Sequence, residues 1–215
     1  VYGDEHRLVA MTLSTLAGVL RGRGDVEAAE AMYLDALAMK RRVLGDEHAS
    51  TSTTLGNLGG LLLSKGELDA AEQVADTLAA EYGNTADAAQ AKLALARLYM
   101  DKNRDQDAAD VLQELLDSDA DIALKHLGRT RLARILLYQG HAQEAVDLLE
   151  GQESEAFGAI WSELLGDAYR ELGRNEEAAE AYQNVMVNPM AQATVDPRLV
   201  QWKLLDLPTA DTAES

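Results

Sequence analysis

An internal repeat of 42 residues constrains the fold of this chain more than any other feature. Three segments within the first 30 residues recur, all with the same offset, between residues 45 and 72. The matching pairs are residues 3–6 with 45–48, residues 12–16 with 54–58, and residues 24–30 with 66–72. Chance does not align three matches in one register. A period of this length is typical of a solenoid, in which each unit buries its apolar face against its neighbours.

The repeat continues beyond residue 72 in a looser form. A turn residue, Gly or Asn, is followed five positions later by Ala, and successive turn residues are 42, 37, 37 and 33 positions apart. These pairs are Gly24/Ala29, Gly66/Ala71, Asn103/Ala108, Gly140/Ala145 and Gly173/Ala178. About three helical turns before each alanine stands a second small residue. These residues are Ala17, Gly59, Ala96, Ala133 and Gly166. Small residues at both positions allow two helices to cross closely, which predicts five helix pairs.

The composition agrees with a helical chain. Leu and Ala are abundant, and all three prolines follow residue 188, so nothing earlier removes a backbone donor. We therefore predict an all-α fold, a right-handed solenoid of about five helix pairs plus a C-terminal capping helix. The cap should begin at Asp196 and Pro197, an N-cap followed by proline. Its Leu199, Trp202 and Leu205 are expected to cover the apolar end of the array.

This arrangement resembles the tetratricopeptide repeat. Residues 2–72 resemble the 42-residue repeats of kinesin light chain and its bacterial relatives. The resemblance is carried by Leu-Gly-Asp-Glu-His at residues 44–48 and by Leu-Gly-Asn-Leu at residues 55–58. It implies a type of repeat and no particular function.

Residues 76–207 resemble a second family, the periplasmic domain of YfgM-type proteins, which are ancillary subunits of the bacterial Sec translocon. The order and spacing of four stretches carry this resemblance. They are residues 89–96, 131–136, 157–167 and 199–207. In that family a cytoplasmic tail and one membrane span precede the periplasmic repeats. Here kinesin-light-chain-like repeats stand in that place.

The two resemblances predict two domains. Residues 1–75 would be kinesin-light-chain-like repeats, and residues 76–215 a YfgM-like domain with its C-terminal cap. The formal charge of residues 1–72 is −4 and that of residues 73–215 is −14, and the repeat shortens near the same place. A fusion of two sources would explain this change, and so would ordinary drift along one array.

Charge and residue types exclude several classes of function. The formal net charge of −18 argues against nucleic acid and against an anionic membrane surface as partners. The chain has no cysteine, hence no disulfide and no thiolate metal site. His6 and His48 lack a second histidine at helical spacing, which favours a loop role over metal binding. We expect no catalytic residue, no metal and no cofactor, and therefore no enzyme.

A glycine-rich run at residues 56–60 has no lysine and no preceding strand, both of which a phosphate-binding loop needs. In the repeat register Gly59 takes the helix-crossing position, whereas Gly56 and Gly60 face the inner groove. Each glycine inside a helix costs about 1 kcal/mol relative to alanine. The two groove glycines therefore mark either sequence drift, which we favour, or a place where a ligand approaches closely.

The inner groove should be lined by the first helix of each pair, at positions four residues apart. Those positions are Ser14 and Gly18, Gly56 and Gly60, Leu93 and Arg97, Thr130 and Arg134, and Glu163 and Asp167. Chaperone-binding members of the superfamily hold a terminal carboxylate with Lys and Asn there, and none of these pairs supplies that clamp. The predicted protein-binding groove consists of Leu93, Arg97, Met100, Thr130, Arg134, Leu137, Glu163 and Asp167. Apolar surface with an adaptable Met and two arginines suits an extended polypeptide. Alternatively, Leu93 and Leu137 pack between repeats.

These features predict a non-enzymatic scaffold that binds proteins or extended polypeptide segments. The YfgM-like resemblance implies Sec translocon components, periplasmic chaperones or unfolded clients as partners, at the periplasmic face of a bacterial inner membrane. Without that resemblance we would expect a cytoplasmic protein. No apolar run reaches the roughly 18 to 20 residues of a membrane span. A start at Val suggests an excised or processed fragment, from which an anchor or export signal could have been removed. The alternative is a stand-alone or engineered chimeric tetratricopeptide scaffold without a single native partner.

Overall fold

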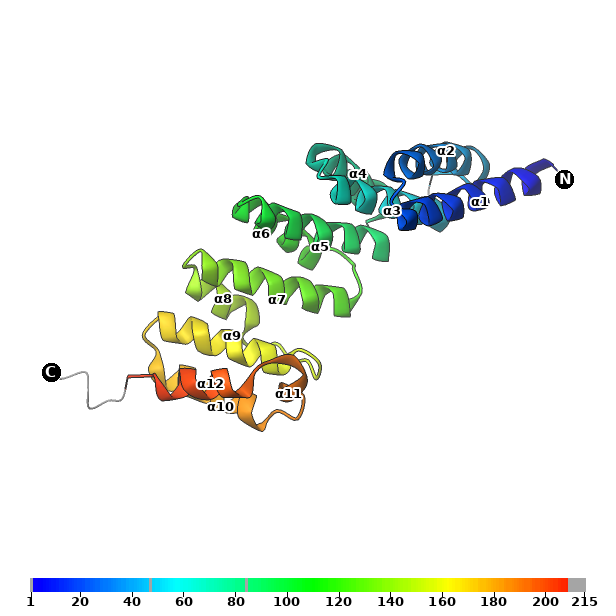
Figure 1. Cartoon of the computed structure of the whole chain (residues 1–215). Coiled ribbons are helices and arrows are strands. Elements are labelled where there is room, and N and C mark those ends of the chain that lie inside the picture. Colours follow the sequence, from blue (N-terminus) through cyan, green and yellow to red (C-terminus); the bar gives the residue numbers. More distant parts are fainter. Residues whose placement is uncertain (1, 47, 84, 209–215) are drawn as a thin grey trace. The chain divides into compact units, whose positions relative to one another are not determined.

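The structure, a computed structural model, describes residues 2–46, 48–83 and 85–208. All regular secondary structure in these residues is helical, which confirms the expected all-α fold (Figure 1). The helices are α1 (Tyr2–Arg23), α2 (Val26–Leu44), α3 (Ala49–Lys65), α4 (Leu68–Tyr82), α5 (Ala86–Asp101), α6 (Asp105–Asp117), α7 (Ile122–Tyr138), α8 (Ala142–Leu149), α9 (Gly158–Glu171), α10 (Asn175–Val187), α11 (Ala191–Thr194) and α12 (Pro197–Leu205). No helix in this part of the chain is long and apolar enough to cross a membrane.

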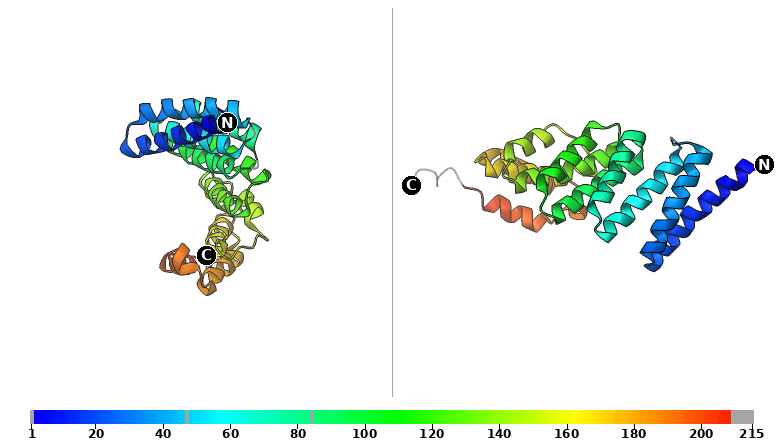
Figure 2. Two further views of the ribbon diagram at one scale, coloured as in Figure 1. Left: turned by 90° about the vertical axis from the view of Figure 1, so that its right-hand side faces the viewer. Right: turned by 90° about the horizontal axis from the view of Figure 1, so that it is seen from above.

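The helix pairs turn at the residues that the repeat register identified. Gly24, Gly66, Gly140 and Gly173 have φ angles of 84°, 76°, 78° and 72°, and Asn103 has a φ angle of 56°. Glycine adopts this left-handed conformation freely, and asparagine tolerates it better than most residues. The turn register is thus confirmed at all five positions, and Figure 2 shows the two helices of a pair lying side by side.

The small residues lie where the two helices of a pair cross. Ala17 and Ala133 are completely buried. A Cβ atom on Gly59 would lie 3.1 Å from Val74 Cγ1, and one on Gly166 would overlap the ring of Tyr182. Larger side chains at these positions would therefore push the helices of a pair apart, as the sequence pattern implied.

The chain forms two compact units, residues 1–125 and residues 126–215. In the first unit, one apolar cluster joins Leu37 and Leu55 to Leu78, Tyr82 and Ala88. This cluster draws on α2, α3, α4 and α5, so it includes residues from both sides of the predicted domain boundary at residue 75. That boundary therefore runs through a continuous core.

In the second unit, α9 packs against both α8 and α10 and contributes the largest fully buried side chain, Trp161. The ring of Phe157 stacks on Trp161, and His126 meets Trp161 edge-on at 4.9 Å between centroids. Burial lowers the pKa of His126, which favours the neutral imidazole beside these two rings.

The C-terminal helix differs from the expectation. Asp196 caps α12 by accepting a hydrogen bond from the Arg198 backbone N–H (2.9 Å), as predicted, and α12 packs on α10. However, Trp202 is 72% exposed and Leu205 is 76% exposed, while Val200 is completely buried. The prediction that Leu199, Trp202 and Leu205 cover the end of the array is therefore wrong. These three residues share one helix face, and α12 is rotated so that the face carrying Val200 meets the array instead.

Candidate functional site

Three residues of the predicted groove lie on α5 in the first unit, and they differ in exposure. Arg97 is exposed and Met100 is partly buried. Leu93, in contrast, is only 5% exposed. Leu93 therefore belongs to the packing between helices, which was the alternative interpretation, and it is not a groove residue.

Thr130, Arg134 and Leu137 come from α7 in the second unit. Thr130 is 3% exposed, and its hydroxyl donates to the His126 carbonyl (2.8 Å) and accepts from Trp161 Nε1 (2.8 Å). Thr130 was expected in the groove, but the need to satisfy a buried indole places it in the core. Leu137 packs partly buried beside the same core, whereas Arg134 is exposed.

Glu163 and Asp167 form the acidic end of the predicted groove, on α9. Both carboxylates bind the ammonium of Lys203 from α12, at 2.8 Å for Glu163 and 2.7 Å for Asp167. The Tyr182 hydroxyl also donates to Asp167 (2.7 Å), and burial together with this bond raises the pKa of Tyr182. A cation of the chain itself therefore occupies the place that the sequence analysis assigned to a ligand.

An open hollow in the first unit lies over α1, α2 and α3. Its volume is about 480 Å³, and its lining includes Ser14, Gly18, Arg21, Lys40 and Asn57. Among the described residues that line it there are two cationic side chains and no carboxylate. In a chain with 37 acidic residues, this makes the hollow an electropositive exception.

Lys40 supplies the buried cation of this hollow. The residue is 4% exposed, and its ammonium donates to Thr54 Oγ1 (2.7 Å) and to the Ser50 carbonyl (3.1 Å). Burial lowers the pKa of Lys40. No carboxylate pairs with it among residues 2–46, 48–83 and 85–208. A partly desolvated ammonium with neutral partners is well suited to binding an incoming anion.

A second hollow, about 230 Å³ in volume, lies between α1, α3, α4 and α5. It shares Arg21 and Asn57 with the first, so the two are neighbours along the same face of α1 and α3. The Arg21 guanidinium crosses from α1 to α3 and donates to the Gly60 carbonyl (3.4 Å). The rest of the lining is mostly small and apolar, for example Ala91 and Ala94.

Gly56 and Gly60 form part of the floor of this second hollow. A Cβ on Gly56 would lie 3.4 Å from Asp87 Cβ, and one on Gly60 would lie 3.4 Å from Arg21 Nη1. Alanine would therefore fit at both positions in ordinary contact. Packing therefore does not require glycine at either position, which agrees with the sequence drift that we favoured and equally with a place where a ligand approaches closely. The cations were missed because Lys40 lies on the second helix of its pair and Arg21 outside the four-apart positions.

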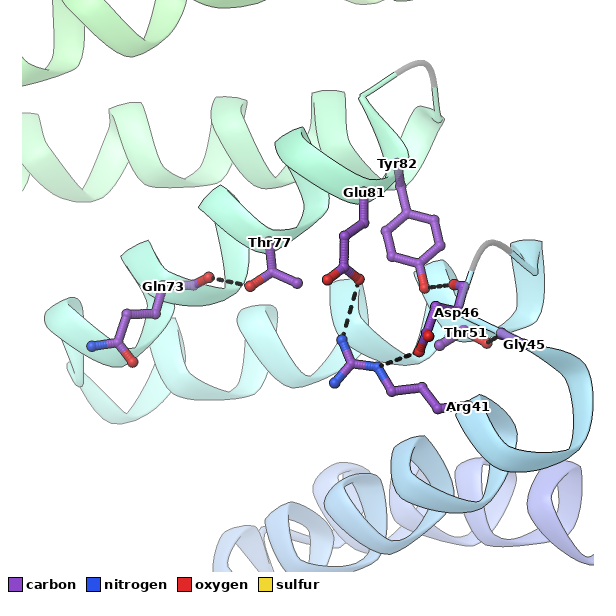
Figure 3. A network of polar contacts seen from close by, with 8 residues as sticks. All are labelled: Arg41, Gly45, Asp46, Thr51, Gln73, Thr77, Glu81 and Tyr82. Carbon is purple, nitrogen blue, oxygen red and sulfur yellow. Dashed lines mark hydrogen bonds and ion pairs between the residues drawn. The ribbon is translucent and has the colours of Figure 1, made fainter.

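In the second copy of the repeated motif, Gly45, Asp46 and His48 lie in the connection between α2 and α3 (Figure 3), whereas the first copy, residues 3–6, lies within α1. The loop role expected for His6 is therefore wrong, because α1 begins ahead of it. Arg41 binds Asp46 of this loop through Nε (3.4 Å) and Glu81 of α4 through Nη2 (3.2 Å), and the Tyr82 hydroxyl donates to the Asp46 carbonyl. His48 caps α3, because its Nδ1 accepts from the backbone N–H two residues further on (3.1 Å). Within the part of the chain that the structure describes, no three His, Asp or Glu side chains are placed to hold a metal ion.

Comparison with known proteins identifies relatives of both parts of the chain. The model of the tetratricopeptide repeat-like domain family matches residues 60–209, and that of the tetratricopeptide repeat matches residues 8–80. The ancillary SecYEG translocon subunit of Escherichia coli (strain K12) is 35% identical over 109 residues, which are 51% of this chain and 52% of that protein. Its counterpart from Neisseria gonorrhoeae (strain ATCC 700825 / FA 1090) is 29% identical over 127 residues, 59% of this chain and 60% of that protein. The chain thus spans between half and two thirds of the length of these curated relatives.

Solved structures share the fold. A putative kinesin light chain from Podospora anserina with nearly identical TPR-like repeats has a TM-score of 0.55 and 22% identity, covering 87% of this chain and 97% of that one. YrrB, described as a TPR protein with an unusual peptide-binding site, has a TM-score of 0.59 and 18% identity, covering 90% of both chains. Both resemblances inferred from the sequence, to kinesin-light-chain repeats and to the translocon subunit, are thus confirmed.

Proposed function

This chain belongs to the tetratricopeptide repeat-like domain family, and on that basis we propose that it is a non-enzymatic scaffold that holds extended polypeptide segments. One observation carries the proposal. Two adjoining hollows run over α1, α3 and neighbouring helices of the first unit, and they combine a cationic end with small apolar walls. A groove of this kind accepts an extended chain, whose backbone and small side chains need little depth.

The cationic end specifies which ligand group it receives. Lys40 and Arg21 face the same hollow, together with hydroxyl and amide side chains such as Ser14 and Asn57. A carboxylate is the ligand group that matches such donors, and a charge-assisted hydrogen bond from a partly buried ammonium is stronger than a neutral one. The ligand is therefore an extended segment with a carboxylate at Lys40 and small apolar residues beside Gly56 and Gly60.

The cellular role that we propose is that of an ancillary Sec-translocon protein that assists secreted or membrane proteins. The identity to two translocon subunits supports this role. Its partners would be Sec components, periplasmic chaperones or unfolded clients, and its location the periplasmic face of the inner membrane. Arg97, Met100, Arg134 and Leu137 remain candidate contacts for such partners, because none of them is buried.

A capture experiment tests this role. The whole chain carrying a photo-crosslinker at Arg97 or Arg134 would be incubated with inner-membrane vesicles, and the adducts identified by mass spectrometry. We expect translocon subunits or secreted clients in the adducts, and fewer of them after Met100→Asp or Leu137→Asp. Adducts that contain neither class at both positions would contradict the translocon role.

A second candidate is a chimeric scaffold, with residues 1–75 and 76–215 of different origin and without a single native partner. The observation behind it is that two different family models match the chain, one over residues 8–80 and the other over residues 60–209, and that they overlap across the predicted seam. In this case the N-terminal groove would bind peptides while the whole chain captured no translocon partner.

A further inference from the structure

The first helix, α1, exposes a stripe of apolar side chains. Leu16 is 41% exposed, Val19 is 47% exposed and Val9 is 48% exposed, all on α1. Their spacing places them on one face, and α1 packs against α2 with a different face, on which Ala10 and Ala17 are completely buried. The stripe therefore lies outside the core of its own helix pair.

The internal repeat allows the exposure of this stripe to be compared with that of the equivalent residues in the next repeat. With the offset of 42, Val9 corresponds to Thr51, Leu16 to Leu58 and Val19 to Leu61 of α3. The relative exposures of these three α3 residues are 0%, 4% and 0%. Val9, Leu16 and Val19 are thus about half exposed on α1, whereas the α3 residues 42 positions later are buried.

The later units behave in the same way. The positions equivalent to Leu16, eight residues before each turn, are held by Leu95 in α5 and Leu132 in α7, which are 3% and 4% exposed. The position equivalent to Val19 is held in α7 by Ile135, which is 4% exposed. Leu98 in α5 and Leu165 in α9, at the remaining leucine positions of this register, are partly buried. The later repeats thus bury the stripe wholly or in part, whereas α1 leaves it exposed.

The helix that covers the stripe of α3 is the second helix of the preceding pair. Leu58 and Leu61 share one apolar cluster with Ala29 and Tyr33 of α2, and α2 packs directly against α3. The chemistry of the covering helix is thus known: a small residue and a tyrosine one turn apart, facing two leucines of the next helix.

A polar contact follows the same pattern. Lys40 of α2, in the first repeat, donates to Thr54 Oγ1 and to the Ser50 carbonyl of α3, in the second repeat, while the Thr54 hydroxyl donates to that carbonyl (3.0 Å). On α1 the equivalent Thr12 hydroxyl donates in the same way to the Leu8 carbonyl (2.9 Å). The acceptors that Lys40 uses on α3 are therefore present in the same arrangement on the exposed face of α1.

We propose that this face of α1 is a docking surface for the second helix of a further 42-residue unit, one that presents an alanine, a tyrosine and a lysine as α2 does. The partner meets Leu16 and Val19 with its apolar residues and Thr12 with its lysine. This inference rests on packing and does not depend on what the groove binds.

An extended protein tests the proposal. A second copy of residues 3–44 is joined in register ahead of residue 3, so that the α2 of the copy can cover α1. Leu16→Lys and Val19→Lys are made in the α1 of the original sequence, both in the extended protein and in the parent. Leu34→Lys is the matched control, because Leu34 is also 49% exposed but its repeat equivalent, Asp76, remains exposed in the structure.

In the parent we expect all three substitutions to move the thermal midpoint by about a degree or less, since they lie on the surface. In the extended protein, Leu16→Lys and Val19→Lys should lower the midpoint by more than about 4 °C, because each buries a charge, and Leu34→Lys should not. Equal effects in the two backgrounds, or no gain of helix on extension, would overturn the proposal. Sedimentation of the parent as a dimer that Leu16→Lys dissociates and Leu34→Lys does not would also overturn it, in favour of a second copy as the occupant.

Discussion

At the scale of single residues, burial determines the role that a side chain plays. Lys40 and Thr130 are both polar and both buried, yet Thr130 has its hydrogen bonds completed by the core, whereas Lys40 has an ammonium that faces a hollow. Gly56 and Gly60 differ from Gly166 in whether the surrounding packing requires a glycine. Gly166 is required by the ring of Tyr182, and the other two are not required by packing.

This contrast predicts opposite effects on stability and on binding. The double variant Gly56→Ala, Gly60→Ala should be more stable by roughly 1 kcal/mol for each position, because alanine favours a helix interior. It should bind extended peptides more weakly, because two methyl groups enter the hollow. Urea unfolding measures the first effect and fluorescence anisotropy of a labelled peptide the second. Gly22→Ala is the control: its Cβ would meet no atom within 4 Å, so peptide binding should not change. Unaltered binding in the double variant would contradict the assignment of the hollow.

At the scale of helices, one contact occurs twice in the chain and holds the first helix of a pair against the preceding helix pair. The Tyr169 hydroxyl donates to Glu150 (3.0 Å), and the Arg174 guanidinium lies 4.5 Å from the centre of the Tyr169 ring while it binds Glu177 through Nε (2.6 Å). In the first unit Tyr99, Glu72, Arg104 and Asp107 make the equivalent contacts. The contact joins a turn to two helices, so it fixes the position of α9 beside the end of α8.

This contact makes stability depend on pH in the alkaline range. Burial, with the hydrogen bond to Glu150, raises the pKa of Tyr169 to about 12, whereas an unfolded tyrosine titrates near 10. A raised pKa in the folded state means that the contribution is complete below pH ~10 and is lost as the pH rises toward 12. Urea midpoints measured from pH 9 to 12 should therefore fall less steeply for Tyr169→Phe than for the unmodified chain. Tyr138→Phe, at a residue that is 74% exposed, should leave the slope unchanged; the same slope for Tyr169→Phe would disprove this role.

The helices and their turns were predictable from sequence because glycine and alanine mark positions with a local steric requirement. A left-handed turn needs Gly or Asn, and a close helix crossing needs a small residue, so Gly24 and Ala17 are recognisable without coordinates. No residue type in the sequence indicates in the same way how a helix is rotated about its axis. Trp202 and Val200 are both apolar, and only packing against α10 decides which of them is buried. Leu93 was misplaced in the groove for the same reason.

The position of the groove stays a prediction. The four-apart positions Ser14, Gly18, Gly56 and Gly60 line the two hollows of the first unit, whereas Leu93 and Thr130 of the predicted protein-binding groove are buried. Lys40 could not be found in this way, because a lysine on a second helix usually points to solvent, and its burial depends on the hydroxyl of Thr54 in the next unit. Likewise the pairing of Glu163 with Lys203 joins residues 40 positions apart.

At the scale of the whole molecule, the origin of the two parts remains a proposal with a clear test. If residues 76–215 descend from a separate domain, that fragment should fold alone and keep α5 to α12. The remainder of α4 should fray, because its partners Leu37 and Leu55 are absent from the fragment. Circular dichroism would measure retained helix, and hydrogen exchange would show where protection is lost. A fragment that unfolds completely would argue for one array and against a fusion.

The central claim is that the hollow at Lys40 and Arg21 binds the carboxylate of an extended polypeptide, and competition between matched peptides tests it most directly. Twelve-residue unstructured peptides of Ala, Ser and Gly would carry one internal Glu, one internal Gln, or a free or amidated C-terminus. We expect carboxylate-bearing peptides to bind more tightly than their neutral partners. Lys40→Met should reduce that preference by roughly 10-fold, the effect of losing a charged hydrogen bond. Arg21→Gln should reduce it by about 2- to 5-fold, and Arg42→Gln, an exposed residue of α2 outside the hollow, should leave it unchanged. Equal binding of the Glu and Gln peptides, or equal losses in all three variants, would contradict the account.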